Sequence, residues 1–301
     1  MKLHADARPL DAPLRGGTRG ATVSVEPLIA GETQLPRGYF ERPGGRAEKL
    51  RVAITPRSRR EWVPVPVFLV RHPSVGLVLI DTGLHPSIGA KPRENFGRLA
   101  ARFVLPPRLA AGQDVPAQLR ARGLDAKQIS VVVMTHLHLD HASAISEFPS
   151  STFVLTAAEW TAATTERRPL LHGYRPAHYD YVFDYRTVSY EGDWVSSYGS
   201  FGRTLDLFGD GSIRLAATPG HSAGHQSVIL RLRERDFVVA ADAVYTINQL
   251  EGGPEQLRPY DMHNWRRSRR ELQLFHRDYA KAIIVPGHDR EFLSNLNERY
   301  E

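Results

Sequence analysis

Three histidines and one aspartate follow the apolar run 131–134 within seven positions. The run predicts a buried β-strand that ends where the polar side chains begin. Because alternate side chains of an extended segment point the same way, His136 and His138 can bind one metal ion. The adjacent Asp140 and His141 diverge and can serve a second ion. A segment that builds only a core would not carry four such side chains at the end of a strand, so the cluster predicts a metal site.

Three further polar residues occupy the same position relative to other apolar runs. Each comes shortly after a predicted strand: His221, Asp242 and His288. One edge of a sheet can gather side chains from the ends of several strands in a single cleft. A single histidine after a strand is usually structural, whereas the joint occurrence of seven candidate ligands in this order is specific.

The composition limits the chemistry of the site. The chain of 301 residues contains no cysteine, which excludes disulfide bonds, thiolate catalysis and cysteine-ligated zinc. Any metal must therefore be held by His, Asp or Glu. Residues 1–20 lack the apolar segment of a signal peptide, and no run approaches the roughly 20 apolar residues of a membrane span. We therefore expect a cytoplasmic protein without a membrane partner.

The net charge of +6 permits an acidic partner but does not indicate one, since the chain has no long basic run. The nearest candidate is the segment 266–270, which carries four arginines inside a helical pattern. Such a segment is usually a solvated helix face. We therefore expect no nucleic-acid partner.

The order of the predicted elements indicates two sheets packed face to face with helices outside, an α/β fold of the αββα sandwich type. Apolar runs predict the following strands: 21–28, 50–55, 63–71, 76–80, 129–134, 153–156, 213–218, 226–231, 237–241 and 283–285. Helical patterns occupy 117–122, 142–147, 157–165 and 265–279.

The domain organisation follows from the segments without such patterns. We expect residues 1–20 to form a flexible N-terminal arm and residues 21–301 a single domain, with insertions near 84–125 and 166–205. The second insertion is aromatic and irregular. It is expected to line a substrate pocket or a dimer interface, or to form a surface loop.

Five segments carry a resemblance to a known family: His136-Leu-His138-Leu-Asp140-His141, Thr218-Pro-Gly-His221-Ser-Ala-Gly-His225, Asp242, Pro286-Gly-His288 and Asp81-Thr-Gly83. Over about residues 50–290 the chain resembles the metallo-β-lactamase superfamily of metal-dependent hydrolases. The resemblance implies that superfamily's fold, in which two mixed β-sheets are flanked by helices.

The resemblance also implies two sites of three ligands each and one shared aspartate: His136, His138 and His221; Asp140, His141 and His288; and Asp242 between them. His225 is expected to be a structural hydrogen-bonding residue, and Asp81 to orient a ligand histidine. This donor set suits two Zn²⁺ ions per chain and also accepts Mn, Fe or Co.

The residues after Asp242 indicate a substrate class. Tyr245 follows three positions later, and both this segment and residues 66–73 resemble the N-acyl homoserine lactonases, quorum-quenching enzymes. In the mechanism that this implies, a hydroxide between two metals attacks the lactone carbonyl while the phenol of Tyr245 steadies the oxyanion. Asp140 is expected to carry a proton to the leaving alkoxide. The expected partner is a small acyl lactone, and a homodimer is an expectation from the family.

Other activities on the same metal site stay open. A thioesterase similar to glyoxalase II would share all seven ligands, although we find no clear match to its basic C-terminal segment. Other lactones, phosphoesters and organophosphate triesters are further candidate substrates. A nuclease would bind nucleic acid in a salt-sensitive way. A flavodiiron-type redox protein would need a flavin domain, for which the chain has no room.

Overall fold

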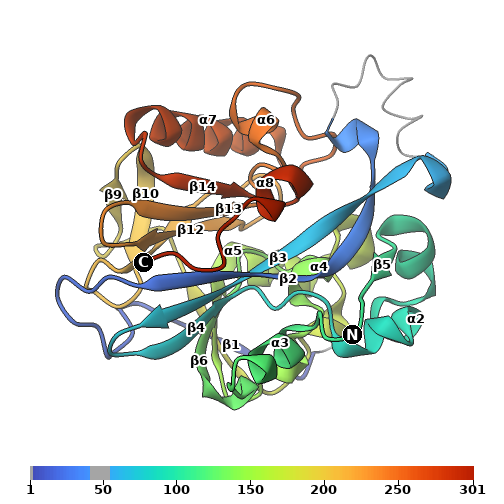
Figure 1. Cartoon of the computed structure of the whole chain (residues 1–301), viewed down its shortest axis with the longest axis horizontal. Helices are drawn as coiled ribbons and strands as arrows, with labels where there is room; N and C mark the ends of the chain where they lie inside the picture. The colour runs from blue at the N-terminus through green and yellow to red at the C-terminus, as the bar shows by residue number, and fades with distance from the viewer. Residues whose placement is uncertain (1–2, 41–54) are drawn as a thin grey trace.

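Two β-sheets pack face to face in the computed structural model, which describes residues 3–40 and 55–301 (Figure 1). In spatial order, the first sheet contains β1 (Ala7–Pro9), β8 (Asp184–Val188), β7 (Thr152–Thr156), β6 (Ile129–Val133), β4 (Gly76–Ile80), β3 (Arg60–His72), β2 (Ser24–Pro36) and β5 (Pro107–Arg108). The second contains β14 (Ile283–Pro286), β13 (Asp236–Ala241), β12 (Gln226–Arg231), β11 (Ile213–Ala217), β10 (Phe201–Asp206) and β9 (Ser196–Tyr198).

Both sheets are mixed. In the first sheet β4, β6, β7 and β8 run parallel, whereas β2 and β3 form a long antiparallel pair. In the second sheet β13 and β14 are parallel and the other neighbours are antiparallel. The ends of the parallel strands therefore meet at common edges, which is the property that gathers side chains from distant parts of the sequence.

Helices cover the outer faces of both sheets (Figure 1). The helices of the described residues are α2 (Pro92–Phe96), α3 (Val115–Ala121), α4 (Leu139–Ala142), α5 (Ala157–Thr165), α6 (Ile247–Leu250), α7 (Met262–Asp278) and α8 (Arg290–Ser294), of which α3, α5, α6 and α7 cover the outer faces. Short 3₁₀ turns lie at Arg37–Tyr39, Arg57–Arg59, Pro86–Gly89, Ala126–Gln128, Ile145–Glu147, Pro169–His172 and Pro176–His178, and a π turn at Ala100–Val104.

Three apolar layers hold this sandwich together. The central layer lies between the sheets and includes Phe68 of β3 and Phe237 of β13, whose ring centroids are 5.8 Å apart. A second layer packs the outer face of the first sheet against α3 and α5. A third packs the outer face of the second sheet against α6 and α7. The predicted αββα sandwich of two mixed sheets is confirmed.

Helix α7 shows how the sequence specifies one of these contacts. The side chain of Asp261 caps its first turn by accepting from the backbone N–H of Asn264. Trp265, Leu272 and Phe275 share a buried stripe at helical spacing. Within the basic run 266–270 three arginines are exposed as predicted, but Arg269 is buried. Its guanidinium donates to two backbone carbonyls, those of Gln249 and Gly253.

The predicted bounds of individual strands and helices differ from the observed ones in several places. Nine of the predicted strands overlap observed ones, and the strand predicted at 50–55 lies outside the described residues. The predicted flexible arm contains β1, which pairs in parallel with β8, so part of it is ordered on the sheet edge. The helix expected at 142–147 is instead the single turn α4 followed by a 3₁₀ turn. None of the helices in the described ranges is long and apolar enough to cross a membrane.

Candidate metal centre

The seven candidate ligands come together at the ends of four strands. His136 and His138 lie in the loop after β6, and Asp140 and His141 in the single turn α4. The other three follow β11, β13 and β14: His221, Asp242 and His288. Their donor atoms form two groups, each with all atoms within 4.8 Å of one another: His136, His138, His221 and Asp242; and Asp140, His141 and His288.

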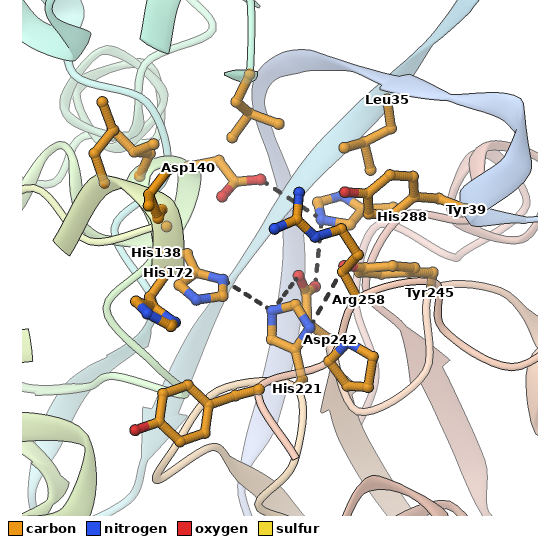
Figure 2. A pocket seen from close by; sticks show the side chains of 17 residues that line it. Leu35, Tyr39, His138, Asp140, His172, His221, Asp242, Tyr245, Arg258 and His288 are labelled. Atoms are coloured by element: carbon orange, nitrogen blue, oxygen red, sulfur yellow. Dashed lines mark hydrogen bonds and ion pairs between the residues drawn. The ribbon is translucent and has the colours of Figure 1, made fainter. Parts of the chain in front are cut away.

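Asp242, a member of the first group, also faces the second group (Figure 2). Its Oδ2 is 3.2 Å from Nε2 of His221 and 3.8 Å from Nε2 of His136. Its Oδ1 is 3.3 Å from Nε2 of His288 and 3.5 Å from Nε2 of His141. One carboxylate thus faces histidines of both groups, which is the geometry that a bridging ligand requires.

The backbone around Asp242 is shaped to bring the carboxylate into this position. Ala241 has a φ of 45°, a left-handed conformation that is rare for a residue with a side chain. Gly287 packs directly against the carboxylate, since a Cβ at this position would lie 2.2 Å from Oδ1 of Asp242. The glycine of the Pro286-Gly-His288 motif is therefore required for space rather than for its φ angle.

The ring nitrogens that point away from the centre have partners. His141 Nδ1 is 2.8 Å from Oδ2 of Asp81, His288 Nδ1 donates to the carbonyl of Pro64 at 2.9 Å, and His221 Nδ1 is 3.1 Å from Oε1 of Gln256. Such contacts fix the ring orientation and leave Nε2 for the centre. His138 is turned the other way, with Nδ1 2.9 Å from Nε2 of His221. Asp81 thus contacts a candidate ligand histidine, as the sequence predicted, and its role in orienting a metal ligand stays a prediction.

Several atoms at the centre lack the partner that buried polar groups normally have. His136 Nε2, His141 Nε2 and Asp242 Oδ1 are buried without a hydrogen bond to any described residue. Most buried polar atoms in folded proteins are satisfied, so this convergence of unsatisfied atoms calls for a bound group. Imidazole and carboxylate donors suit divalent ions of the zinc type. The residues present therefore fit a dinuclear site.

The charge balance of the cluster supports the same conclusion. Burial and neighbouring histidines lower the pKa of His136 and His138, so both rings are neutral, as metal ligands must be. Burial also lowers the pKa of His141 and His288, but Asp242 and neighbouring carboxylates outweigh it and raise both. This half of the cluster thus favours positive charge, which a divalent ion would supply.

The cluster opens into a cavity of about 290 Å³. Figure 2 shows Tyr39, Tyr245 and Arg258 around the candidate ligands, with Arg258 projecting into the cavity. Five leucines form an apolar part of the wall: Leu35, Leu105, Leu139, Leu170 and Leu171. Two of these leucines come from the Pro169–His172 turn. The insertion 166–205 thus lines the cavity in part, while its tyrosines Tyr174, Tyr179 and Tyr185 are buried in the core.

Tyr245 is buried beside the candidate ligands. Its hydroxyl is 3.4 Å from Nδ1 of His221, and its ring packs against those of Tyr39 and His288. Burial, then the nearby Asp242, raise the pKa of Tyr245 well above its usual range. The phenol therefore keeps its proton and can act as a hydrogen-bond donor toward the cavity.

His225 belongs to neither ligand group, and its ring packs against those of His136 and His221, with centroids 5.2 and 5.8 Å away. Its Nδ1 is 2.9 Å from Oγ1 of Thr218, and burial lowers its pKa to about 3. The contact with Thr218 agrees with the structural, hydrogen-bonding role predicted for His225, which stays a prediction.

Sequence reasoning missed several residues of the site. Gln256, which contacts both His221 and the backbone of Asp242, lies in a loop without any periodic pattern. Tyr39 and Arg258 reach the cavity from segments far apart in the chain. Glu159 had a partial signal, because Thr156 and Glu159 have the spacing of a helix cap. That spacing does not reveal that the Glu159 side chain turns inward.

Comparison with known proteins identifies the family. The sequence pattern of the Metallo-beta-lactamase superfamily matches residues 60–288, which contain all seven candidate ligands. The chain belongs to the metallo-β-lactamase superfamily. Within this superfamily it is 31% identical over 243 residues to the N-acyl homoserine lactonase AttM of Rhizobium radiobacter, a match that covers 79% of this chain and 87% of AttM. The expectation of a metal-dependent hydrolase is confirmed.

A second lactonase sequence and a solved lactonase structure are also similar to this chain. The N-acyl homoserine lactonase AiiB of Agrobacterium fabrum is 29% identical over 258 residues, covering 80% of this chain and 85% of AiiB. A solved N-acyl homoserine lactone hydrolase, with N-hexanoyl-L-homoserine bound at its catalytic metal centre, superposes with a TM-score of 0.72. It covers 92% of this chain and 97% of its own at 20% identity, which supports the fold alone.

Proposed function

We propose that this chain opens the lactone ring of N-acyl homoserine lactones with two divalent metal ions. The proposed ligands are His136, His138, Asp140, His141, His221, Asp242 and His288, and the proposed metal is Zn²⁺, although the same donors accept Mn, Fe or Co. The observation that carries the proposal is the position of Tyr245, a protonated phenol in the wall of the cavity beside the ligands. The lactonase relatives support the substrate class.

Each group of the chain has a defined task in this proposal. The metal ions, when bound, supply an activated water and a Lewis acid for the carbonyl. Tyr245 donates its hydroxyl proton in a hydrogen bond to the carbonyl oxygen, where negative charge develops. Asp140, whose Oδ2 is 3.6 Å from Nε2 of His288, would take the proton of the water that adds to the carbonyl carbon. It would pass this proton to the ring oxygen when the C–O bond to the carbonyl carbon breaks, which gives the hydroxyl group of the opened product.

The apolar wall of the cavity suits an acyl chain. Leu171 is 65% exposed and lines the cavity, so its apolar surface is open to a ligand there. Leu35, Leu105 and Leu170 extend the same wall. An acyl chain that covers these leucines removes apolar surface from water, and the binding energy grows with chain length.

Replacing Leu171 with serine is expected to lower kcat/KM for decanoyl homoserine lactone about threefold to tenfold, because contacts worth roughly 1 kcal/mol are lost. The butanoyl substrate, too short to gain much from this wall, is expected to change less than about twofold. Leu99 is a matched control, since it is 64% exposed and does not line the cavity. Equal effects of Leu171→Ser and Leu99→Ser on both substrates would contradict the assignment of this wall.

A substrate panel tests the function itself. The metal-replete protein is assayed with acyl homoserine lactones of several lengths, S-lactoylglutathione, bis-p-nitrophenyl phosphate and a β-lactam. We expect the highest kcat/KM for the homoserine lactones, measured by the proton released when the ring opens. The proposal is wrong if none of the lactones is opened while a thioester or a phosphoester is turned over.

A further inference from the structure

A buried glutamate outside the ligand set contacts both loops that carry the histidines of the first group. Glu159 lies in the first turn of α5 and is 0% exposed. Within the described ranges its carboxylate forms no ion pair with an Arg, Lys or His side chain, whereas buried carboxylates are normally paired. The proposed hydrolytic steps do not use this side chain.

Three donors converge on this carboxylate. Its Oε1 accepts from the backbone N–H of Leu137, between His136 and His138, at 2.9 Å. Its Oε2 accepts from the hydroxyl of Ser222 at 2.7 Å and from the backbone N–H of Gly224 at 2.9 Å. Ser222 directly follows His221 in the chain. One side chain thus joins two loops that are more than 80 residues apart in sequence, at positions next to three candidate ligands.

The first turn of α5 is docked tightly against the second loop. The hydroxyl of Thr156 donates to the carbonyl of Gly224 at 2.7 Å and accepts from the backbone N–H of Glu159 at 3.0 Å. A Cβ on Gly224 would lie 2.0 Å from the hydroxyl oxygen of Thr156 and 2.2 Å from the nitrogen of Glu159. The loop therefore cannot move away from or toward the helix without breaking these contacts.

We propose that Glu159 is a positioning residue that holds the His136–His138 loop and the His221 loop in the relative geometry needed to bind the first metal ion. The inference rests on the proposed function, because it takes these histidines as metal ligands. A carboxylate suits the task because it only accepts, and it can accept all three donors at once. The N-terminal turn of a helix also favours negative charge.

Burying a carboxylate costs stability, so packing alone does not explain a glutamate at this position. Burial raises the pKa of Glu159, and the hydrogen bonds that it accepts, among them those from Leu137, Ser222 and Gly224, offset this only in part. An apolar side chain in its place would avoid the desolvation cost but would leave two backbone N–H groups without an acceptor.

The test is the Zn²⁺ affinity of Glu159→Gln, measured by competition with a chromophoric chelator. Glutamine keeps the shape but presents an NH₂ group to donors, so we expect the affinity at the first site to fall about 10- to 100-fold. We also expect lactonase kcat to recover when Zn²⁺ is added in excess, with KM for the lactone little changed. A purely structural role would lower thermal stability without this recovery.

Asp210→Asn is the matched control. Asp210 is 7% exposed and accepts from the backbone N–H groups of Thr18 and Ser212, and its Oδ2 is 2.9 Å from Nε2 of His72. None of these partners is a candidate ligand. Like Glu159→Gln, this substitution replaces a buried carboxylate that accepts several hydrogen bonds with the corresponding amide. We expect a loss of stability and an unchanged Zn²⁺ affinity.

Ser222→Ala serves as a milder variant if Glu159→Gln does not fold. It removes one of the three donors, and we expect the Zn²⁺ affinity to fall about threefold to tenfold. The proposal is overturned if the variants that fold bind Zn²⁺ like the wild type, or if Asp210→Asn loses as much affinity. A wild-type chain that binds no divalent ion would contradict the proposed function and this proposal together, whereas two bound ions with an unaffected Glu159→Gln would contradict this proposal alone.

Discussion

Replacing Asp242 with alanine is expected to reduce the metal content of the chain from about two ions to fewer than one and kcat for the lactone by more than about a thousandfold. The carboxylate faces His221 and His136 through one oxygen and His288 and His141 through the other. Its removal leaves both groups of donors without the negative charge that balances two dications. Metal content is measured by elemental analysis after gel filtration, and kcat on the same sample.

Asp236→Ala is the control for this experiment. Asp236 opens β13, the strand that ends next to Asp242, and accepts a hydrogen bond from the hydroxyl of Tyr198 at 2.8 Å. Its loss is expected to lower stability slightly without changing the metal content. An Asp242→Ala variant that keeps two ions and a kcat within about tenfold of the wild type would show that Asp242 is not the bridging ligand.

Metal binding is also expected to raise the melting temperature of the folded chain. A ligand that binds only the folded chain stabilises it by an amount that grows with its concentration relative to its dissociation constant. We therefore expect a chelator to lower the melting temperature of the wild type. Asp242→Ala, which retains less metal, is expected to show a smaller shift under the same conditions.

The central strands were predictable because their apolar runs are short, uninterrupted and bounded by polar or glycine-containing segments. β4, β12 and α5 have the predicted bounds. The ligands were predictable for a related reason, since each follows such a run directly or within a short loop. Strands that pair in parallel, such as β13 and β14, end at one edge, so their terminal side chains meet there.

The parts that escaped prediction depend on contacts without a local signal. β1 is a three-residue edge strand that exists through its pairing with β8, 178 residues further along the chain at Ala7 and Tyr185. The sequence presents Arg269 as one more residue of a basic surface, but its guanidinium donates to two backbone carbonyls, that of Gln249 in α6 and that of Gly253 in the loop after it. Asp81 has a φ of 60°, which allows its carboxylate to reach both Thr135 and His141.

Replacing Tyr245 with phenylalanine is expected to lower kcat about 10- to 1,000-fold while two metal ions remain bound, because one donor to the developing oxyanion is lost. Among the described residues the hydroxyl has only a long contact to His221, at 3.4 Å, so its removal leaves the ligand geometry in place. Since the phenol acts on charge that develops during the reaction, kcat should fall more than KM rises.

Tyr179→Phe is the matched control, because Tyr179 is fully buried and its hydroxyl donates to the carbonyl of Ala163 at 2.7 Å, outside the cavity. We expect this variant to lose stability but to keep kcat. If Tyr245→Phe retains both its metal ions and the wild-type kcat, the phenol is not a catalytic donor. The substrate assignment would then rest on the apolar wall and the relatives alone. The proposed metal centre at Asp242 would be unaffected, because Tyr245→Phe and Asp242→Ala test different side chains of the same cavity.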